Sequence, residues 1–415
     1  MTIFSKISVV GLGYIGLPTA AMFASKGVEV IGLDVSTNVV NTINRGEIHI
    51  IEPGLSEIVS NAVANGKLRA TLKPETSQAF LIAVPTPFSG NNHDPDLSYI
   101  KSACKNIAPV LEKGNLVILE STSPIGATEQ MANWLSEYRP DLSFPQSKGE
   151  AADISIAHCP ERVLPGRVME ELIINDRVIG GMTEKCSLAA NDLYSIFVTG
   201  KCVIASGPAV AEMAKLTENS FRDVNIAFAN ELSMICDKLD VDIWELIALS
   251  NRHPRVNILQ PGPGVGGHCI AVDPWFIVSS CPDLSHLVRT AREVNDKKPF
   301  WVIDQILDAV NIASSANKIP TVALLGLAFK PNIDDMRESP AIEIGLHLLK
   351  MKKLCNVIAV EPNVSDFDVK GLNLASYDDA ISLADIVVVL VDHDEFKAKD
   401  KPLNKIVIDT RGMWQ

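Results

Sequence analysis

A glycine-rich loop with a cysteine at its exit is the part of this sequence best suited to chemistry. Residues 261–275 read PGPGVGGHCIAVDPW, in which Cys269 follows four glycines and two prolines. Glycine lets a backbone approach a ligand closely, and a cysteine thiolate is a strong nucleophile. His268 precedes the cysteine and Asp273 follows it, so groups that lower a thiol pKa or activate water are close in sequence. The pattern predicts a nucleophilic Cys269; the alternative is a cysteine that only packs in the core.

A long helix is predicted to carry the next candidates. The stretch from Gly207 to about Leu239 has no glycine or proline beyond its first turn. Lys215, Asn219 and Arg222 are spaced by four and three residues and therefore share one face of this helix. Such a face is often solvated, but the apolar residues around it favour a buried helix that joins two domains. We expect Lys215 and Asn219 to point into a site and the remaining surface to offer a dimer contact.

Two further loops add charged residues to the candidate site. The segment HCPERVLPG at 158–166 follows a predicted strand and places Glu161 and Arg162 between prolines, where they would face a cleft. His253 and Arg255 stand in the segment NRHPRVNI, just before the cysteine loop. Arginine forks match phosphate oxygens, so these basic residues favour phosphate or sugar contacts over a plain surface patch.

The N-terminal segment carries a dinucleotide-binding pattern. A predicted strand at 7–10 is followed by GLGYIG at 11–16, a helix of small residues, and a second strand that ends in Asp34. In this context Gly11, Gly13 and Gly16 let a pyrophosphate approach the helix N-terminus, and Asp34 binds the ribose hydroxyls. Because a carboxylate repels a 2'-phosphate, the pattern predicts NAD rather than NADP. The alternative is that the glycines serve only tight packing between strand and helix.

Apolar runs alternate with helical segments along both halves of the chain. In the first half the predicted strands are 7–10, 28–33, 79–84, 116–120, 154–157, 177–180 and 201–205, and in the second half they are 321–325, 357–360, 386–391 and 405–409. This alternation is typical of parallel, doubly wound sheets. We therefore predict an α/β protein with two Rossmann-like domains bridged by a long central helix and a small helical domain. The predicted domains are 1–206, which binds NAD, 207–312, which carries the helix, dimer contact and cysteine loop, and 313–415, which binds a UDP-sugar.

Composition limits the partners and the compartment. The 415 residues are 47 % hydrophobic and 21 % charged, with a formal net charge of −13. Such a balance is typical of a folded domain protein, and the negative charge argues against nucleic acid or an anionic membrane as a partner. No apolar run reaches the length of a membrane span, and the N-terminus lacks a signal-peptide pattern, which together predict a cytoplasmic protein. The eight cysteines are scattered, with no paired spacing, so we expect reduced thiols and no metal site.

The joint order of these motifs resembles a known family along essentially the whole chain. The segments GLGYIGLP, PTPF, ESTSPIG, CPERVLPG, KLTENSFRDVNIAFANE, PGPGVGGHCIAVDP and GLAFKPNIDDMRESP are similar to those of the UDP-glucose/GDP-mannose dehydrogenase family. Within it, the chain resembles the branch that oxidises UDP-N-acetyl-D-mannosamine. Pro165 stands where the UDP-glucose branch usually has a second glutamate. His268 and the run IAVD stand where that branch usually has serine and FPKD.

The resemblance implies a four-electron oxidation of the sugar C6 alcohol to a carboxylate with two NAD and one water. The product would be a uronate for cell-surface polysaccharides. Cys269 would form a thiohemiacetal and then a thioester. Lys215 would act as acid/base or stabilise an oxyanion with Asn219, and Glu161 and Asp273 would activate or orient water. Alternatives are the same reaction on UDP-glucose or UDP-N-acetylglucosamine, a two-electron 3-hydroxyacid-type dehydrogenase, or a nucleotide-binding regulator without turnover.

The resemblance also implies which residues bind the two ligands, and it implies a homodimer through the central helix. For NAD these are Gly11, Gly13, Tyr14, Ile15, Gly16, Asp34, Thr86, Thr128 and Arg337. For the UDP-sugar they are Arg162, Val163, Lys215, Asn219, Arg222, His253, Arg255, Gly266, Phe329 and Lys330.

Overall fold

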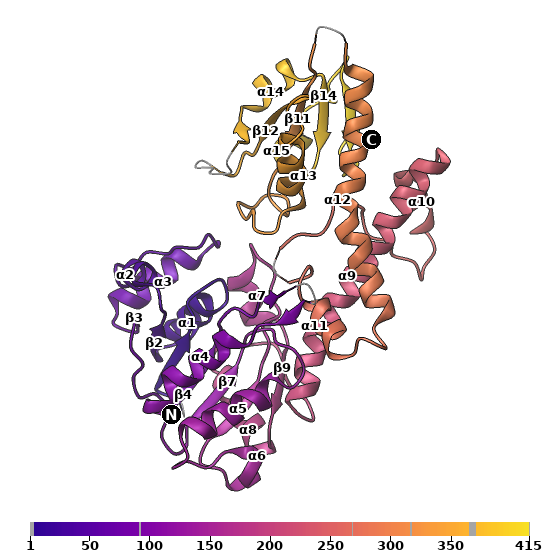
Figure 1. Ribbon diagram of the computed structural model, residues 1–415. Helices are drawn as coiled ribbons and strands as arrows, with labels where there is room; N and C mark the ends of the chain where they lie inside the picture. The colour runs from indigo at the N-terminus through magenta and orange to yellow at the C-terminus, as the bar shows by residue number, and fades with distance from the viewer. Residues whose placement is uncertain (1–3, 91–92, 268, 316–317, 365–370, 415) are drawn as a thin grey trace. The chain divides into compact units, whose positions relative to one another are not determined.

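The computed structural model describes residues 4–90, 93–267, 269–315, 318–364 and 371–414. His268, beside the cysteine, lies outside the described residues. The chain forms two compact units, Met1–Glu218 and Asn219–Gln415, and each is described by itself. Figure 1 shows the helices and strands of both units. The division into three domains stays a prediction.

The first unit is built on an eight-stranded sheet with the strand order β10-β9-β8-β7-β4-β1-β2-β3. Its central strands are almost entirely apolar and buried, which is typical of a sheet covered by helices on both faces. The strands are β1 (Lys6–Val10), β2 (Glu29–Leu33), β3 (Leu68–Thr71), β4 (Ala79–Ile82), β7 (Leu116–Leu119), β8 (Ser155–His158), β9 (Arg177–Gly181) and β10 (Cys202–Ile204), with a separate two-stranded ribbon of β5 (Phe88–Ser89) and β6 (Asp94–Pro95).

Helices cover both faces of this sheet, so two apolar cores form in the first unit. One core takes side chains from α1, α3, α7 and α8, and the other takes them from α4 and α5. This arrangement confirms the doubly wound Rossmann-like fold. The helices are α1 (Gly16–Ser25), α2 (Thr37–Asn44), α3 (Leu55–Ala64), α4 (Ser98–Ile107), α5 (Ala127–Tyr138), α6 (Pro145–Lys148), α7 (Val168–Ile174) and α8 (Glu184–Tyr194).

One feature of the predicted sheet is wrong: not all its strands are parallel. β9 runs antiparallel to β8, with Ala157 opposite Gly181, and β10 then runs parallel to β9. The connection from β8 to β9 holds only the seven-residue helix α7, which contacts α1, so it returns the chain beside β8 in the opposite direction. Alternation of strands and helices does not record this reversal.

The helix α9 (Pro208–Leu239) is one continuous element of 32 residues, as the absence of internal glycine and proline predicts. The second unit continues with α10 (Ile243–Ser250), α11 (Asp273–Ser280) and α12 (His286–Ala313), and α12 contains Pro299 in its interior. The cysteine loop lies between α10 and α11. Its residues 256–267 form no helix or strand, so their backbone groups need partners from elsewhere in the unit.

A five-stranded parallel sheet, ordered β13-β12-β11-β14-β15, completes the second unit. Side chains of α12 and α13 pack on one face and those of α14 and α15 on the other, which confirms a second Rossmann-like fold (Figure 1). The elements are β11 (Thr321–Leu325), α13 (Pro340–Leu349), β12 (Asn356–Val360), β13 (Asn373–Leu374), α14 (Tyr377–Leu383), β14 (Ile386–Val389), α15 (Asp394–Lys397) and β15 (Ile406–Asp409).

Candidate functional site

The turn between β1 and α1 has the shape that a dinucleotide needs. Gly11 has φ of +89°, and a Cβ there would lie 2.6 Å from the carbonyl oxygen of Ala83. A Cβ on Gly16 would lie 1.8 Å from the carbonyl oxygen of Gly11, so this position also requires glycine. Gly13 instead faces open space, and no side chain caps the N-terminus of α1. A pyrophosphate therefore fits against the turn and the positive end of the helix dipole.

Asp34, at the end of β2, joins this turn to the sheet. Its Oδ2 accepts a hydrogen bond from the Leu12 N–H at 2.9 Å, and its Oδ1 accepts one from the Ser36 N–H at 2.8 Å. An ionised carboxylate has about four acceptor positions. Asp34 can therefore hold the turn and still accept hydrogen bonds from the two hydroxyls of a ribose. Tyr14 and Ile15, within the turn, are half-buried.

The other two cofactor candidates of the first unit differ in exposure. Thr86 is half-buried in the loop after β4. Thr128 is fully buried at the start of α5, and its hydroxyl donates to Glu212 at 2.6 Å. Glu212 also accepts from the N–H groups of Thr128 and Gly126, so this carboxylate of α9 caps α5. Burial raises the pKa of Glu212. Sequence reasoning did not identify Glu212, because its partner lies 84 residues away.

Glu161 lies in a buried ionic cluster that sequence reasoning also missed. Its Oε1 accepts from the Arg162 N–H at 2.7 Å, and its Oε2 lies 2.7 Å from Nη2 of Arg177. Nη1 of the same guanidinium lies 3.6 Å from Glu120, which accepts a hydrogen bond from Tyr194. One guanidinium thus lies beside two buried carboxylates, of Glu161, which is 93 % buried, and of Glu120, which is 99 % buried. The contact with Arg177 fixes the position of the Glu161 carboxylate, as a water-orienting group requires.

Burial changes the ionisation of the groups around this cluster. It raises the pKa of Glu120 to about 7, with the Glu161 charge adding to the effect and Arg177 opposing it. It also raises the pKa of Cys159 to about 12 and lowers that of His158 to about 3. Cys159 is therefore a thiol and His158 a neutral imidazole at neutral pH. Neither is suited to the nucleophilic role predicted for Cys269.

The remaining candidates of the first unit lie along α9 and the loop after β8. Arg162 makes two contacts with Glu218, at 3.1 Å through Nε and at 2.6 Å through Nη2. This pairing orients the guanidinium, which also donates from Nη1 to the Asp176 carbonyl. Val163 is half-buried against the apolar core, and Lys215 is half-buried on α9.

In the second unit, Cys269 is exposed at the start of a helical turn that leads into α11. The N–H groups of Val272 and Asp273 donate to the Cys269 carbonyl at 3.1 and 2.8 Å. The Asp273 carboxylate is buried, and its Oδ2 accepts from Nδ2 of Asn219 at 2.5 Å. Asn219 and Asp273 are thus paired, and Asp273 lies one helical turn from the cysteine. Their separate predicted roles, Asn219 as a donor beside Lys215 and Asp273 in activating water, stay predictions.

The glycines of the cysteine loop pack on the loop that follows β11. A Cβ on Gly266 would lie 2.5 Å from the Glu338 carbonyl oxygen and 2.8 Å from the Phe329 Cβ. Gly267 has φ of +83°, and a Cβ there would lie 3.1 Å from the Phe329 ring. Any larger residue would push the two loops apart. The two sequence motifs are therefore adjacent in the fold of this unit.

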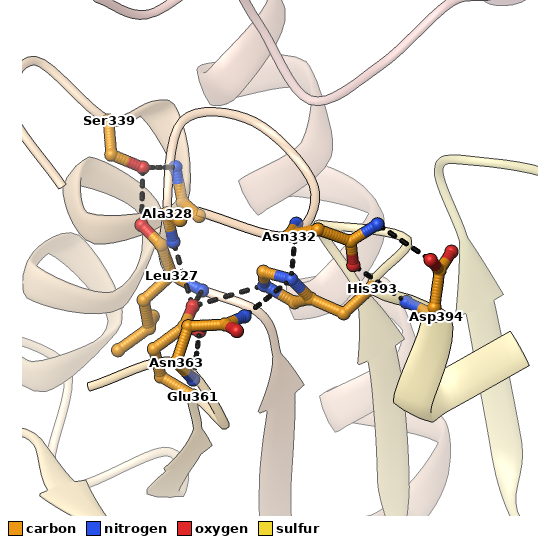
Figure 2. Close-up of polar contacts among 9 residues, drawn as sticks. Leu327, Ala328, Asn332, Ser339, Glu361, Asn363, His393 and Asp394 are labelled. Carbon is orange, nitrogen blue, oxygen red and sulfur yellow. Dashed lines mark hydrogen bonds and ion pairs between the residues drawn. The ribbon is translucent and has the colours of Figure 1, made fainter. Parts of the chain in front are cut away.

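A closed polar network fixes the loop that carries Phe329 and Lys330 (Figure 2). Oε2 of Glu361 accepts from the N–H groups of Leu327 and Ala328 at 2.7 and 2.9 Å. On the far side of the loop, the Asn332 N–H donates to Nδ1 of His393 at 3.0 Å. Because Nδ1 accepts, the imidazole proton resides on Nε2, which faces Glu361 at 3.2 Å. The loop is held at both ends by one buried acid–histidine pair.

The other basic candidates of this unit are exposed, except Lys330. Arg337 pairs with Asp335 through contacts of 2.6 and 2.9 Å, and Lys330 is half-buried. Arg222, His253 and Arg255 are exposed on α9 and in the loop after α10. Arg337 belongs to the second unit and the other cofactor candidates to the first, so its contact with NAD stays a prediction.

Arg411 is a further residue at the cysteine loop that the motifs did not reveal. Its Nη1 donates to the Pro261 carbonyl at 3.2 Å, and its Nε donates to Asp392 at 2.9 Å. A Cβ on Gly262 would lie 2.6 Å from the same guanidinium. The segment DTR at the end of the last strand was the available signal, since strand ends in such sheets face ligands.

In the part of the chain that the structure describes, no group of three or more His, Cys, Asp and Glu side chains has the arrangement of a metal site. No described helix combines the length and the apolar character needed to cross a membrane.

Comparison with protein families matches almost the whole chain to one family. Residues 5–198 match the NAD binding domain of the UDP-glucose/GDP-mannose dehydrogenase family, residues 209–297 its central domain, and residues 323–415 its UDP binding domain. The matched NAD binding domain contains the glycine turn and Asp34. The matched UDP binding domain contains the loop of Figure 2.

Individual relatives agree with this result over their full length. The UDP-N-acetyl-D-mannosamine dehydrogenase of Salmonella typhi is 60 % identical over 99 % of this chain and 100 % of its own. The NDP-N-acetyl-D-galactosaminuronic acid dehydrogenase of Ralstonia nicotianae is 59 % identical over 99 % of this chain and 96 % of its own. The solved structure of UDP-D-ManNAc dehydrogenase from Pyrococcus horikoshii is 40 % identical, covers 99 % of this chain and 96 % of its own, and has a TM-score of 0.89. The chain belongs to the UDP-glucose/GDP-mannose dehydrogenase family and is an NAD-dependent oxidoreductase that acts on a nucleotide sugar.

Proposed function

We propose that the protein oxidises C6 of UDP-N-acetyl-D-mannosamine to the carboxylate through a covalent intermediate on Cys269. The overall reaction consumes one alcohol, two NAD and one water, and it yields one carboxylate and two NADH. The exposed Cys269, one turn before the buried Asp273 that pairs with the half-buried Asn219, carries this proposal. The uronate would serve cell-surface polysaccharide synthesis.

In the first oxidation a base takes the proton of the C6 hydroxyl as hydride leaves carbon. NAD supplies the hydride acceptor in both oxidations. Lys215 is our candidate for the proton transfer, and Asn219 donates to the same oxygen. The ammonium group and the amide would then stabilise negative charge on that oxygen in the later steps.

The Cys269 thiolate adds to the aldehyde carbon and forms a thiohemiacetal whose oxygen is held by Lys215 and Asn219. Loss of a second hydride converts this adduct into a thioester. Water then attacks the thioester carbon, the carbon–sulfur bond breaks, and the thiolate is restored. Glu161 and Asp273 are the carboxylates proposed to take a proton from this water or to orient it. Because the aldehyde stays bound to sulfur, it need not leave the protein.

Ligand contacts complete the proposal. NAD would lie on the turn of Gly11, Gly13, Tyr14, Ile15 and Gly16, with Asp34, Thr86, Thr128 and Arg337 as further contacts. The UDP-sugar would lie against Arg162, Val163, Arg222, His253, Arg255, Gly266, Phe329 and Lys330. Neighbouring side chains orient two of these elements: the half-buried Glu218 orients Arg162, and the buried Glu361 and His393 orient the Phe329 loop.

The sugar itself has a rival candidate. Relatives named for N-acetylmannosamine and for N-acetylgalactosaminuronic acid are equally similar to this chain, at 60 % and 59 % identity. The departures from the UDP-glucose branch at Pro165 and in the run IAVD favour an N-acetylated hexose. We favour the mannosamine substrate because CPERVLPG together with NRHPRVNILQPGPGVGGHCIAVDPWF resembles that branch.

Stoichiometry tests both parts of the proposal. With UDP-N-acetylmannosamine as limiting substrate, we expect two NADH per sugar, measured by absorbance together with uronate detection. UDP-N-acetylgalactosamine, UDP-glucose and UDP-N-acetylglucosamine should give none in the same assay. One NADH per sugar would replace the covalent route by a two-electron oxidation. Two NADH with UDP-N-acetylgalactosamine alone would retain the route and change the substrate.

We also propose that the chain forms a homodimer through α9. Phe221, Phe228 and Ile235 of this helix are 71 %, 51 % and 45 % exposed. They are spaced by seven residues and therefore form one apolar stripe on the surface of the helix. A second copy of the same helix offers a matching stripe, as a two-fold contact requires.

Light scattering after size exclusion tests the dimer. We expect the wild-type protein to have twice the mass of one chain, and Phe228→Asp to shift this mass toward a single chain because it places a charge within the stripe. Leu403→Asp is the matched control, since Leu403 is exposed but lies outside α9. A wild-type mass equal to one chain would reject the proposal.

A further inference from the structure

Four polar side chains in the core of the second unit form a hydrogen-bonded network. The reaction steps above assign no role to this network. Asp223 and Asn230 of α9 and Arg292 and Asn295 of α12 are all at least 99 % buried. Nη1 of Arg292 donates to Oδ1 of Asp223 at 2.5 Å, and Nδ2 of Asn295 donates to the same oxygen at 2.8 Å. Oδ1 of Asn295 accepts from Nδ2 of Asn230 at 2.8 Å.

Both ends of this network contact the backbone of the cysteine loop. Oδ1 of Asn230 accepts from the Gly262 N–H at 2.9 Å, at the beginning of the loop. Arg292 approaches the Ile270 carbonyl at 3.5 Å, immediately after Cys269. Residues 262–267, which begin at the first of these points, form no helix or strand, so such contacts determine the course of their backbone.

The stability of the fold alone does not explain why these four buried side chains are polar. Burying an ion pair costs desolvation, and apolar residues of similar volume often hold two helices together at least as well. Among the described residues, Asp223 Oδ2 and Arg292 Nε have no hydrogen-bond partner. Burial raises the pKa of Asp223 to about 6, the direction expected for a carboxylate whose burial is only partly compensated. What these side chains do provide, and apolar packing does not, is directional hydrogen bonding to the loop backbone.

We propose that Asp223, Arg292, Asn295 and Asn230 are positioning residues that fix the loop backbone at Gly262 and at Ile270 and thereby aim Cys269 at the sugar. This inference rests on the proposed role of Cys269. Displacing a reacting atom by about 1 Å lowers a rate by about 100-fold. Loss of the network should therefore lower kcat more than KM, because it displaces the nucleophile while all the proposed sugar contacts except Gly266 lie outside this loop.

The test compares two substitutions that break contacts between the same two helices. Asn230→Leu removes the acceptor for Gly262 and the link to Asn295. Ser233→Ala, one turn further along α9, removes the acceptor for Lys298 on α12, and this contact does not involve the loop. Asn230→Asp, which keeps an oxygen facing Gly262, is the conservative variant. The measurements are kcat, KM, urea unfolding, and the pH dependence of Cys269 alkylation by iodoacetamide, followed by mass spectrometry.

We expect Asn230→Leu to lower kcat by about 100-fold with little change in KM, and to shift the midpoint of the alkylation profile. Asn230→Asp should recover part of the lost rate, and Ser233→Ala should keep kcat within about three-fold even where it lowers the urea midpoint. Equal losses of kcat in Asn230→Leu and Ser233→Ala, or an unchanged alkylation profile in Asn230→Leu, would reject the inference. If alkylation of Cys269 in the wild-type protein left turnover intact, the proposed function itself would fail, and that result is independent of the variants.

Discussion

Replacing Cys269 with alanine is expected to abolish formation of the uronate, with kcat falling by about 10⁴-fold or more. Removal of a catalytic nucleophile has effects of this order, and what remains comes from binding and from the other groups of the site. Without the thiolate there is no thioester, so the second oxidation loses its substrate. Uronate formation and NADH release under limiting sugar measure the effect.

Cys281→Ala is the matched control for this prediction. Among the described cysteines, Cys281 is the other one that is exposed, and it lies at the end of α11 in the same unit. We expect this variant to keep wild-type turnover and to remain sensitive to iodoacetamide, because Cys269 is still present. If Cys269→Ala retained full uronate production, the covalent mechanism would be wrong and the cysteine loop would have another role.

Much of the fold could be predicted because the buried strands are continuous apolar runs. The predicted strands 79–84 and 386–391 correspond to β4 and β14, whose side chains are all buried. β3 was missed because it lies at the sheet edge and exposes Arg69, so its four residues have no continuous apolar run. The direction of β9 was also missed. Strand direction depends on how a connection packs, and composition does not record that.

In the candidate site, too, only some of the residues could be identified from the sequence. Residues that stand in one motif, such as Cys269 and Asp273, were identified because their spacing in sequence is also their spacing in the turn. Their supporting partners were not identified. Arg177 meets Glu161 only through the pairing of β9 beside β8, and Asn230 meets Gly262 across 32 residues. When an arginine begins an apolar strand, the sequence does not show whether its side chain is buried in an ion pair or exposed at the edge of the sheet.

Replacing Arg177 with methionine is expected to destabilise the first unit by about 3–5 kcal/mol at pH 8. The substitution keeps the length of the side chain but leaves Glu161 and Glu120 buried without their cation, and breaking a buried pair from one side has a cost of this order. The guanidinium also lies 4.6 Å from the centre of the Tyr194 ring, a contact that methionine replaces only in part. Urea unfolding at fixed pH measures the change.

Arg177→Met should lower the free energy of unfolding less at pH 5 than at pH 8. The direction of this pH dependence follows from the raised pKa of Glu120. Its pKa is raised in the folded protein to about 7 from an ordinary value of 4.5, so the folded state binds this proton more tightly than the unfolded state. Stability from such a group is greatest below its ordinary pKa and is lost as pH rises toward the folded value. Without Arg177, which lowers the pKa of Glu120, the folded value rises further. The variant should therefore regain part of its stability in acid, where Glu120 is protonated.

Two further variants test whether the buried ion pair of Arg177 differs from an exposed ion pair in its effect on stability, and whether it also affects turnover. Arg167→Met removes an exposed contact with Glu170 and should leave the urea midpoint unchanged. Adding Glu120→Gln to Arg177→Met should recover part of the lost stability, because one of the two uncompensated charges is then absent. Turnover should not recover in this double variant, since Glu161 still lacks the guanidinium that orients it for the water step. A variant Arg177→Met that unfolded at the wild-type urea concentration at pH 8 would show that the two carboxylates find other compensation, and the orientation of Glu161 would then need another explanation.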